Sequence, residues 1–189
     1  VGWRRPLTSI HWMPGRHTAE IFSNDITHSW HPFTQMRDYA ATEPLLVESA
    51  EGNWLVDTDG RRLLDGVASL WCNVHGHRVP EIDAAISSQL ERVAHSTMLG
   101  SGSVPAIELA TELARVSPPG LERVFFAENG ASAVEIALKM AFQHWQLRGQ
   151  SQRTRFLAFE NAYHGDTLGA MSVGGIELFH DTFRPLLFD

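Results

Sequence analysis

Two short segments of the sequence carry residues suited to holding a phosphorylated aromatic molecule. Residues 129–132 (NGAS) are small and leave backbone N–H groups uncovered where a helix is expected to begin, and helix N-termini attract phosphate. Residues 163–166 (YHGD) offer an aromatic ring that can stack on a flat heterocycle, next to a glycine that lets the backbone come close. Together the two segments suit one phosphorylated aromatic cofactor.

Each segment also has an ordinary structural explanation. Residues 129–132 could form a glycine turn into a packed helix, Tyr163 could be a core aromatic, and His164 could be a hydrogen-bonded loop residue. The sequence contains no GxxxxGK[ST] or GxGxxG pattern, so neither a nucleoside triphosphate nor a dinucleotide is indicated. What favours binding is the expected meeting of both segments at one edge of a sheet.

The flanking pattern predicts the elements that would bring the segments together. Residues 123–129 (RVFFAEN) and 155–161 (RFLAFEN) are typical of short buried strands, and residues 130–149 between them are typical of an amphipathic helix. A β-α-β order predicts a parallel sheet, and ligands bind beyond the carboxyl ends of parallel strands. Both segments come directly after such an end.

The preceding residues predict a second kind of structure. Short apolar runs between residues 45 and 67, separated by Gly-containing turns, predict an antiparallel β-meander. Apolar periodicity after Pro80 and after Pro105 predicts two amphipathic helices. The fold class is therefore α/β.

We expect three regions along the chain. Residues 1–25 are expected to be a poorly ordered leader, because their pattern is irregular. Residues 26–78 would form an N-terminal segment and the meander of a small domain. Residues 79–189 would form helices and the incomplete start of a larger domain.

Composition argues against several classes of partner. The net charge of −7, from 22 acidic and 15 basic residues, disfavours nucleic acid and anionic membranes, which reward clustered Lys and Arg. One cysteine excludes an intrachain disulfide, and no apolar stretch reaches the ~18 residues of a membrane span. His75 and His77 are joined by no further residues at ligand spacing, so no metal site is assigned. We expect a cytoplasmic protein.

Five stretches of the sequence carry a family resemblance: WHPFTQM (30–36), LLVESAEGNWLVDTDGRRLLDGVASLWCNVHGH (45–77), AHSTMLG (94–100), FFAENGASAVEIALKMAFQHW (125–145) and NAYHGDTLGAMSVGG (161–175). They resemble the class III, fold type I aminotransferases, which use pyridoxal 5′-phosphate (PLP). The resemblance runs from about Ser29 to Asp189, and the first and last stretches are most similar to the branch of the family that acts on 8-amino-7-oxononanoate in biotin biosynthesis.

The resemblance implies a role for both segments. In this family the pair matching Gly130 and Ala131 binds the cofactor phosphate, and the tyrosine matching Tyr163 lies against the cofactor ring and borders the substrate. His164 is expected among the cofactor-binding residues, and Asp166 is expected to shape the same loop. Many members have serine where this chain has Ala131. Both backbone donors are kept, so we expect phosphate binding to persist.

The resemblance also implies substrate-binding residues and a reaction. Phe33, Trp71 and Tyr163 match positions that line the substrate pocket. Many members have Tyr at position 33 and a Trp pair where this chain has Leu70-Trp71, so the amino donor is either S-adenosylmethionine or lysine. The family reaction would transfer an amino group to 8-amino-7-oxononanoate and give 7,8-diaminononanoate. The family also implies a homodimer of the full-length enzyme.

The lysine content leads us to interpret the chain as an N-terminal fragment. Transamination through PLP needs a Schiff-base lysine, and Lys139 is the single lysine of the chain. A solvated pair with Glu135, four residues earlier in the predicted helix, explains Lys139 fully, so no catalytic residue is assigned. In the family, the Schiff-base lysine lies well downstream of the YHGD segment. The alternatives are another class III (ω-amino acid) aminotransferase and a non-catalytic relative.

Overall fold

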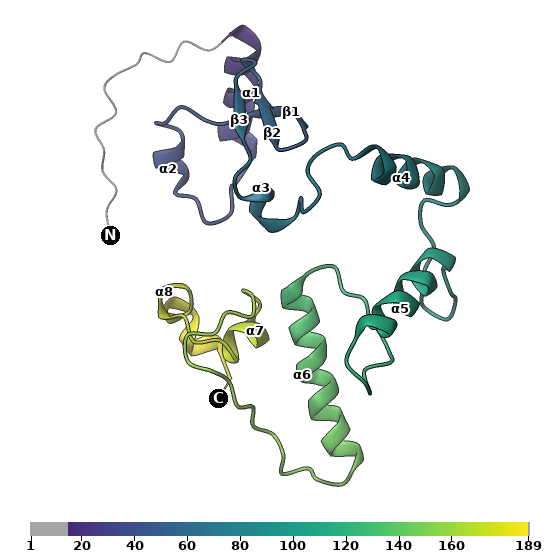
Figure 1. Ribbon diagram of the computed structural model, residues 1–189. Helices are drawn as coiled ribbons and strands as arrows, with labels where there is room; N and C mark the ends of the chain where they lie inside the picture. The colour runs from purple at the N-terminus through teal and green to yellow at the C-terminus, as the bar shows by residue number, and fades with distance from the viewer. Residues whose placement is uncertain (1–14, 189) are drawn as a thin grey trace. The chain divides into compact units, whose positions relative to one another are not determined.

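A computed structural model describes residues 15–188, which form two compact units dividing between Ser96 and Thr97 (Figure 1). The predicted boundary after residue 78 lies earlier, so the helix that follows Pro80 belongs to the first unit. The first unit contains α1 (Arg16–His28), α2 (Met36–Tyr39), β1 (Val47–Glu51), β2 (Trp54–Asp57), β3 (Arg62–Leu64), α3 (Ala68–Trp71) and α4 (Pro80–Arg92). The second contains α5 (Val104–Val116), α6 (Gly130–Leu147), α7 (Leu168–Ser172), α8 (Glu177–His180) and the 3₁₀ helix η1 (Asp181–Leu186).

The predicted meander is confirmed as a three-stranded antiparallel sheet in the order β1-β2-β3. β1 pairs with β2 through Glu51 and Trp54, and β2 pairs with β3 through Trp54 and Leu64. The turns that join the strands place Gly52 and Gly60 at φ 55° and 79°, where residues with a Cβ are disfavoured. The turn glycines in the sequence therefore mark the strand ends correctly.

Helix α1 overturns part of the predicted leader. Residues 1–14 lie outside the described part of the chain, but residues 16–25 belong to a regular helix rather than to a poorly ordered segment. Its buried Thr18 hydroxyl contacts the Thr58 hydroxyl at 3.0 Å and donates to Asp59 Oδ1 at 2.6 Å. These contacts span about forty positions, so the local pattern could not reveal them.

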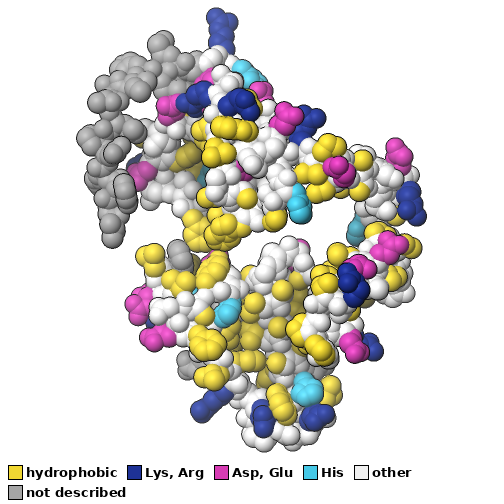
Figure 2. All heavy atoms as spheres, in the orientation of Figure 1, with side chains coloured by type: hydrophobic (Ala, Val, Ile, Leu, Met, Phe, Trp, Pro, Cys, Tyr) yellow, Lys and Arg dark blue, Asp and Glu magenta, His cyan; other side chains and the backbone are white. Residues whose placement is uncertain are grey.

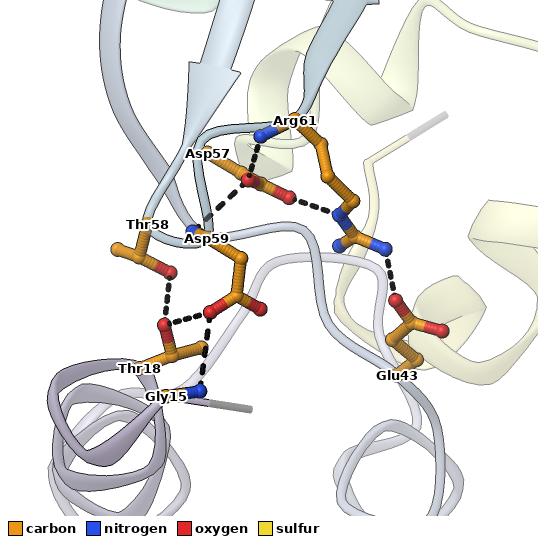
Figure 3. Close-up of polar contacts among 7 residues, drawn as sticks. All are labelled: Gly15, Thr18, Glu43, Asp57, Thr58, Asp59 and Arg61. Carbon is orange, nitrogen blue, oxygen red and sulfur yellow. Dashed lines mark hydrogen bonds and ion pairs between the residues drawn. The ribbon is translucent and has the colours of Figure 1, made fainter. Parts of the chain in front are cut away.

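A buried carboxylate organises the turn between β2 and β3 (Figure 3). Asp57 is 2% exposed, and its Oδ1 accepts from the backbone N–H groups of Asp59 and Arg61 at 3.0 and 2.8 Å. Arg61 Nε donates to Asp57 Oδ2 at 2.6 Å, and the same guanidinium pairs with Glu43. Burial alone would raise the pKa of the Asp57 carboxyl, but hydrogen bonds from the Arg61 backbone and side chain outweigh it and lower that pKa.

We predict that acid weakens the sheet through Asp57. Because the folded-state pKa is lowered, the carboxylate stabilises the fold above its unfolded pKa of about 3.9, and this stability is lost as pH falls through the folded value. Native-state hydrogen exchange of β2 and β3 amides in the full-length protein should show weaker protection at pH 3 than at pH 6. Asp57→Asn should lower the free energy of unfolding at pH 6 by about 1.5–3 kcal/mol. In this variant the protection of the β2 and β3 amides should also depend less on pH. An unchanged pH profile in that variant would contradict the assignment.

Three helices, one in the first unit and two in the second, confirm sequence predictions. The helix expected over residues 130–149 is α6, and it begins at Gly130 as predicted. The helices expected after Pro80 and Pro105 are α4 and α5, each with proline in its first turn. Helix α7 packs beside the N-terminal part of α6 (Figure 1).

The two predicted strands of the β-α-β unit do not form in the described residues. Residues 123–127 and 155–159 carry no regular secondary structure. A strand exists only through hydrogen bonds to a neighbour, and no segment within residues 15–188 pairs with either stretch. Phe125, Leu157 and Phe159 are accordingly exposed. The one sheet within residues 15–188 is antiparallel, and the parallel sheet stays a prediction.

Burial of hydrophobic side chains is limited in both units. In the described residues the buried hydrophobic side chains are Ala170, Met171 and Val173, all in or next to α7. Large hydrophobic side chains are visible at the surface (Figure 2). No helix within residues 15–188 combines the length and apolar character that crossing a membrane requires.

Candidate functional site

The structure brings the two predicted segments together at the N-terminus of α6. They line one cavity of about 750 Å³ in the second unit. Its lining residues are Asn129, Gly130, Ala131, Val134, Tyr163, His164, Gly165, Asp166 and Thr167. The predicted meeting of the NGAS and YHGD segments is therefore observed, although the strands expected to produce it are not formed.

The start of α6 leaves two backbone donors available. Asn129 caps the helix, because its Oδ1 accepts from Ser132 N–H at 2.9 Å and its carbonyl accepts from Ala133 N–H at 3.1 Å. Within the described residues, the N–H groups of Gly130 and Ala131 have no acceptor. Two free amides at the positive end of an 18-residue helix have the geometry that suits an anion.

A close backbone contact holds the YHGD segment against this helix start. A Cβ added to Gly165 would lie 2.4 Å from Ala131 Cβ and 2.8 Å from Ala131 Cα. Gly165 also has φ 117°, a conformation that residues with a side chain rarely adopt. Glycine is therefore required at position 165 for two reasons, and the small side chain of Ala131 belongs to the same contact.

Tyr163 faces the cavity with its hydroxyl fixed. The hydroxyl donates to Asp166 Oδ2 at 2.6 Å, and this hydrogen bond raises the pKa of Tyr163 above its ordinary value. The residue is 50% exposed, which argues against the alternative of a core aromatic. Asp166 thus orients the ring, in agreement with the predicted shaping role of that residue.

Glu135 has a different partner from the one the sequence suggested. Its Oε1 accepts from Gly169 N–H at 2.8 Å, which attaches α7 to α6. The neighbouring Thr167 hydroxyl and the backbone amides of Gly169 and Ala170 hold the pKa of the Glu135 carboxyl below its ordinary value, and Lys139 has only a small effect. The expected ion pair between Glu135 and Lys139 is thus not the main interaction of this carboxylate.

Lys139 lies apart from the cavity at the α6 N-terminus. It is exposed and lines another cavity of about 450 Å³, together with apolar residues such as Leu138, Phe142 and Phe156. No residue of the NGAS or YHGD segments lines that second cavity. The position of Lys139 therefore gives no support to a catalytic role.

Phe33 is presented by a braced loop of the first unit. The residue has φ 51° and is 78% exposed. Asp25 braces the loop, since its Oδ1 lies 2.8 Å from His31 Nε2 and its Oδ2 accepts from the Tyr39 hydroxyl at 2.7 Å. The hydrogen bond with His31 is the main cause of the lowered pKa of Asp25. Burial of Tyr39 and its hydrogen bond to Asp25 raise the pKa of Tyr39 to about 12.

Trp71 is presented by a strained turn of the first unit. The residue is 79% exposed and ends α3, whose residues Ala68, Ser69 and Leu70 share with it a positive φ between 47° and 73°. A left-handed helical conformation costs roughly 1–2 kcal/mol per residue that carries a Cβ. Four such residues in succession need strong support from their surroundings.

Sequence reasoning missed the capping role of Asn129 and two of the contacts that support the site. Asn129 carried a detectable signal, because an Asn directly before an amphipathic helix is a common N-cap. The contacts between Gly165 and Ala131 and between Glu135 and Gly169 carried none, since each joins residues 34 positions apart. Within residues 15–188, no three His, Cys, Asp or Glu side chains gather as metal ligands would.

The chain is similar in sequence to curated aminotransferases. The chain is 58% identical over 174 residues to the adenosylmethionine-8-amino-7-oxononanoate aminotransferase of Nitratidesulfovibrio vulgaris, covering 91% of this chain and 32% of the relative. It is 51% identical over 176 residues to the Geobacter sulfurreducens enzyme of the same name, covering 93% of this chain and 39% of that relative. The chain therefore spans about a third of the length of these curated relatives.

Solved structures give the same result for the fold. The enzyme of the same name from Methanocaldococcus jannaschii matches with a TM-score of 0.88 and 50% identity, over 90% of this chain and 39% of that chain. An (S)-enantioselective omega-transaminase from Thermomicrobium roseum matches with a TM-score of 0.82 and 39% identity, over 87% of this chain and 37% of that chain. These matches confirm the α/β fold class.

The family assignment rests on a match that covers most of the chain. The family model described as aminotransferase class-III matches residues 36–188, a range that includes the helix start at Gly130 and the YHGD segment. This confirms the family resemblance found in the sequence. The chain belongs to the class III aminotransferases, a family of PLP-dependent enzymes.

Proposed function

We propose that the full-length protein transfers an amino group to 8-amino-7-oxononanoate and gives 7,8-diaminononanoate. The observation that carries this proposal is the 58% identity to a relative named for this substrate, over 91% of the chain. The cavity at the N-terminus of α6 supports the class of reaction, because it offers what a phosphorylated aromatic cofactor requires. A chain that spans a third of its relatives would supply only part of the catalytic machinery.

The residues around the cavity fit PLP. The free N–H groups of Gly130 and Ala131 would hold the phosphate, and neither needs a side-chain hydroxyl for this. The ring of Tyr163, oriented by Asp166, would lie against the cofactor ring, with His164 in the same loop. When bound, PLP supplies a reactive aldehyde and an electron-accepting ring for moving amino groups.

Two residues of the first unit complete the proposal. We assign substrate contacts to Phe33 and Trp71 as well as Tyr163. Both Phe33 and Trp71 expose most of their side chains on loops that are held by hydrogen bonds to the Asp25 and Asp65 carboxylates, which suits residues that receive a ligand. The donor remains either S-adenosylmethionine or lysine. The homodimer and the cytoplasmic location stay predictions.

The chain by itself should be inactive. Lys139 is its single lysine and lies on a different cavity from Tyr163 and Gly130. The lysine that carries PLP would therefore come from the remaining two thirds of the full-length protein.

The proposal is tested with the purified full-length protein. It is incubated with PLP, 8-amino-7-oxononanoate and either S-adenosylmethionine or lysine, and mass spectrometry detects 7,8-diaminononanoate. We expect product with at least one of the two donors. The likeness to an omega-transaminase favours an ω-amino acid aminotransferase as a second candidate. Transfer from β-alanine to pyruvate, with no product from 8-amino-7-oxononanoate, would support that candidate, and no transfer with any pair would support a non-catalytic relative.

A further inference from the structure

The segment that carries Trp71 forms one complete left-handed helical turn. Ala68, Ser69, Leu70 and Trp71 have φ of 50°, 47°, 62° and 73°. Trp71 N–H donates to Val67 C=O at 2.8 Å, and Cys72 N–H donates to Ala68 C=O at 2.9 Å, which closes the turn. Residues with a Cβ enter this conformation singly as a rule, so a run of four is unusual. Such strain persists only where the surrounding structure enforces it.

Asp65 enforces this turn from its N-terminal side. Its Oδ1 accepts from Ser69 N–H and its Oδ2 accepts from the Ser69 hydroxyl, both at 2.8 Å. His77 Nε2 lies 2.8 Å from the same Oδ2, and since an ionised carboxylate only accepts, this nitrogen is the donor. The Asp65 side chain is 5% exposed, so these three donors replace water as its partners.

The base of the loop is anchored at both ends to the turn between β1 and β2. Asp65 N–H donates to Asn53 C=O at 2.9 Å, and His77 exchanges two backbone hydrogen bonds with Gly52, at 3.0 and 2.7 Å. A Cβ at Gly76 would lie 2.9 Å from Gly52 C=O, so the two backbones touch. Residues 65–77 are therefore fixed at the base.

The tip of the same loop points its largest side chains outward. Leu70 is 65% exposed and Trp71 is 79% exposed, so burial within the unit does not compensate for the strained backbone. A fixed base beneath a strained, apolar and exposed tip is the arrangement expected where side chains are held ready for a ligand.

We propose that Asp65 is a positioning residue for the aminotransferase reaction: together with His77, it holds the left-handed turn 68–71 and so sets where Leu70 and Trp71 meet the substrate. This rests on the proposed contact between Trp71 and substrate. Asp65 itself does not touch the substrate. Its loss should act on substrate binding rather than on PLP binding, because Gly130 and Tyr163 belong to separate segments.

The test uses the full-length enzyme and two readouts. Hydrogen exchange of the peptide covering residues 66–77 reports the turn, and KM and kcat for 8-amino-7-oxononanoate report the reaction. We expect Asp65→Ala to speed exchange of the 69–73 amides at least tenfold and to raise KM about tenfold, with kcat changed less than threefold. Asp65→Asn keeps the side-chain volume and one acceptor, so it should change the exchange rate and KM in the same direction but by less. If Asp65→Ala does not fold, Asp65→Asn provides the test.

A rescue and a matched control separate positioning from general stability. Ser69→Gly in the Asp65→Ala background removes the strain at φ 47°, so KM should return to within threefold of the wild-type value. Asp57→Ala is the control, because Asp57 is an equally buried carboxylate with three hydrogen bonds in the same sheet and none to the turn. It should leave KM and the 69–73 exchange unchanged.

The outcomes distinguish this inference from the proposed function. If Trp71→Ala raises KM while both Asp65 variants leave it unchanged, Asp65 does not position the turn and the inference is wrong. If Asp57→Ala raises KM as much as Asp65→Ala does, the effect is general destabilisation and the inference is also wrong. If Trp71→Ala leaves KM unchanged in an active enzyme, the proposed substrate contact fails and the inference falls with it. Absence of all amino transfer would instead overturn the proposed function.

Discussion

Replacing Gly165 with alanine is expected to weaken PLP binding by the full-length protein about tenfold to a hundredfold. The added Cβ would lie 2.4 Å from Ala131 Cβ, which no rotamer change can relieve, and φ 117° is unfavourable for alanine. Overpacking of this kind costs about 1–3 kcal/mol. The least costly relief is to move the YHGD segment away from the helix start, which separates Tyr163 from the Gly130 amide. Equilibrium titration with PLP, followed by absorbance, measures the effect.

Gly120→Ala is the matched control for this variant. Gly120 also has a positive φ, 92°, in the same unit, but no atom lies within 4 Å of the added Cβ. It should therefore share the backbone strain and keep wild-type PLP affinity. Equal loss of PLP affinity in the two variants would show that the contact between Gly165 and Ala131 has no role in cofactor binding.

Replacing Tyr163 with alanine should weaken PLP retention about tenfold, whereas Tyr163→Phe should leave it nearly unchanged. A stacked ring contributes about 0.5–1.5 kcal/mol beyond the area it buries, and phenylalanine keeps that ring. Tyr163→Phe removes the hydroxyl that donates to Asp166, so a loss of turnover in this variant would report the contribution of the hydroxyl and of the ring orientation it fixes.

If Tyr163 were a core aromatic, its replacement by alanine would change folding stability rather than PLP affinity. A core aromatic replaced by alanine should cost about 3–5 kcal/mol of folding free energy and spare PLP affinity in the protein that still folds. The half-exposed ring makes a smaller stability loss the expected result. PLP affinity and unfolding free energy, measured on wild type and both variants, decide between the accounts. Unchanged affinity with a large loss of stability would refute the proposed contact.

Elements whose stability is local were the ones that sequence could predict. Helix α6 has its Asn129 cap and its apolar periodicity within one stretch, and the meander has its turn glycines between its strands. The candidate cofactor site was also predictable, because the NGAS and YHGD segments each carry their chemistry in four adjacent residues. Their meeting followed from fold-level rules rather than from any single residue.

Elements whose stability depends on distant residues could not be predicted. Helix α1 is attached through Thr18 to a turn some forty residues away, and the left-handed turn of α3 depends on Asp65 and His77. The stretches 123–127 and 155–159 have the composition of strands, yet a strand forms only beside a partner, and none lies within the described residues. Local pattern cannot tell whether that partner is present.

A crystal structure of the full-length protein with PLP tests the central claim most directly. That claim is that the free amides at the start of α6 and the ring of Tyr163 hold the cofactor. We expect phosphate oxygens within hydrogen-bonding distance of the Gly130 and Ala131 backbone nitrogens, and the cofactor ring against Tyr163. A phosphate bound by other residues, with the cavity at the α6 N-terminus filled only by water, would contradict the account.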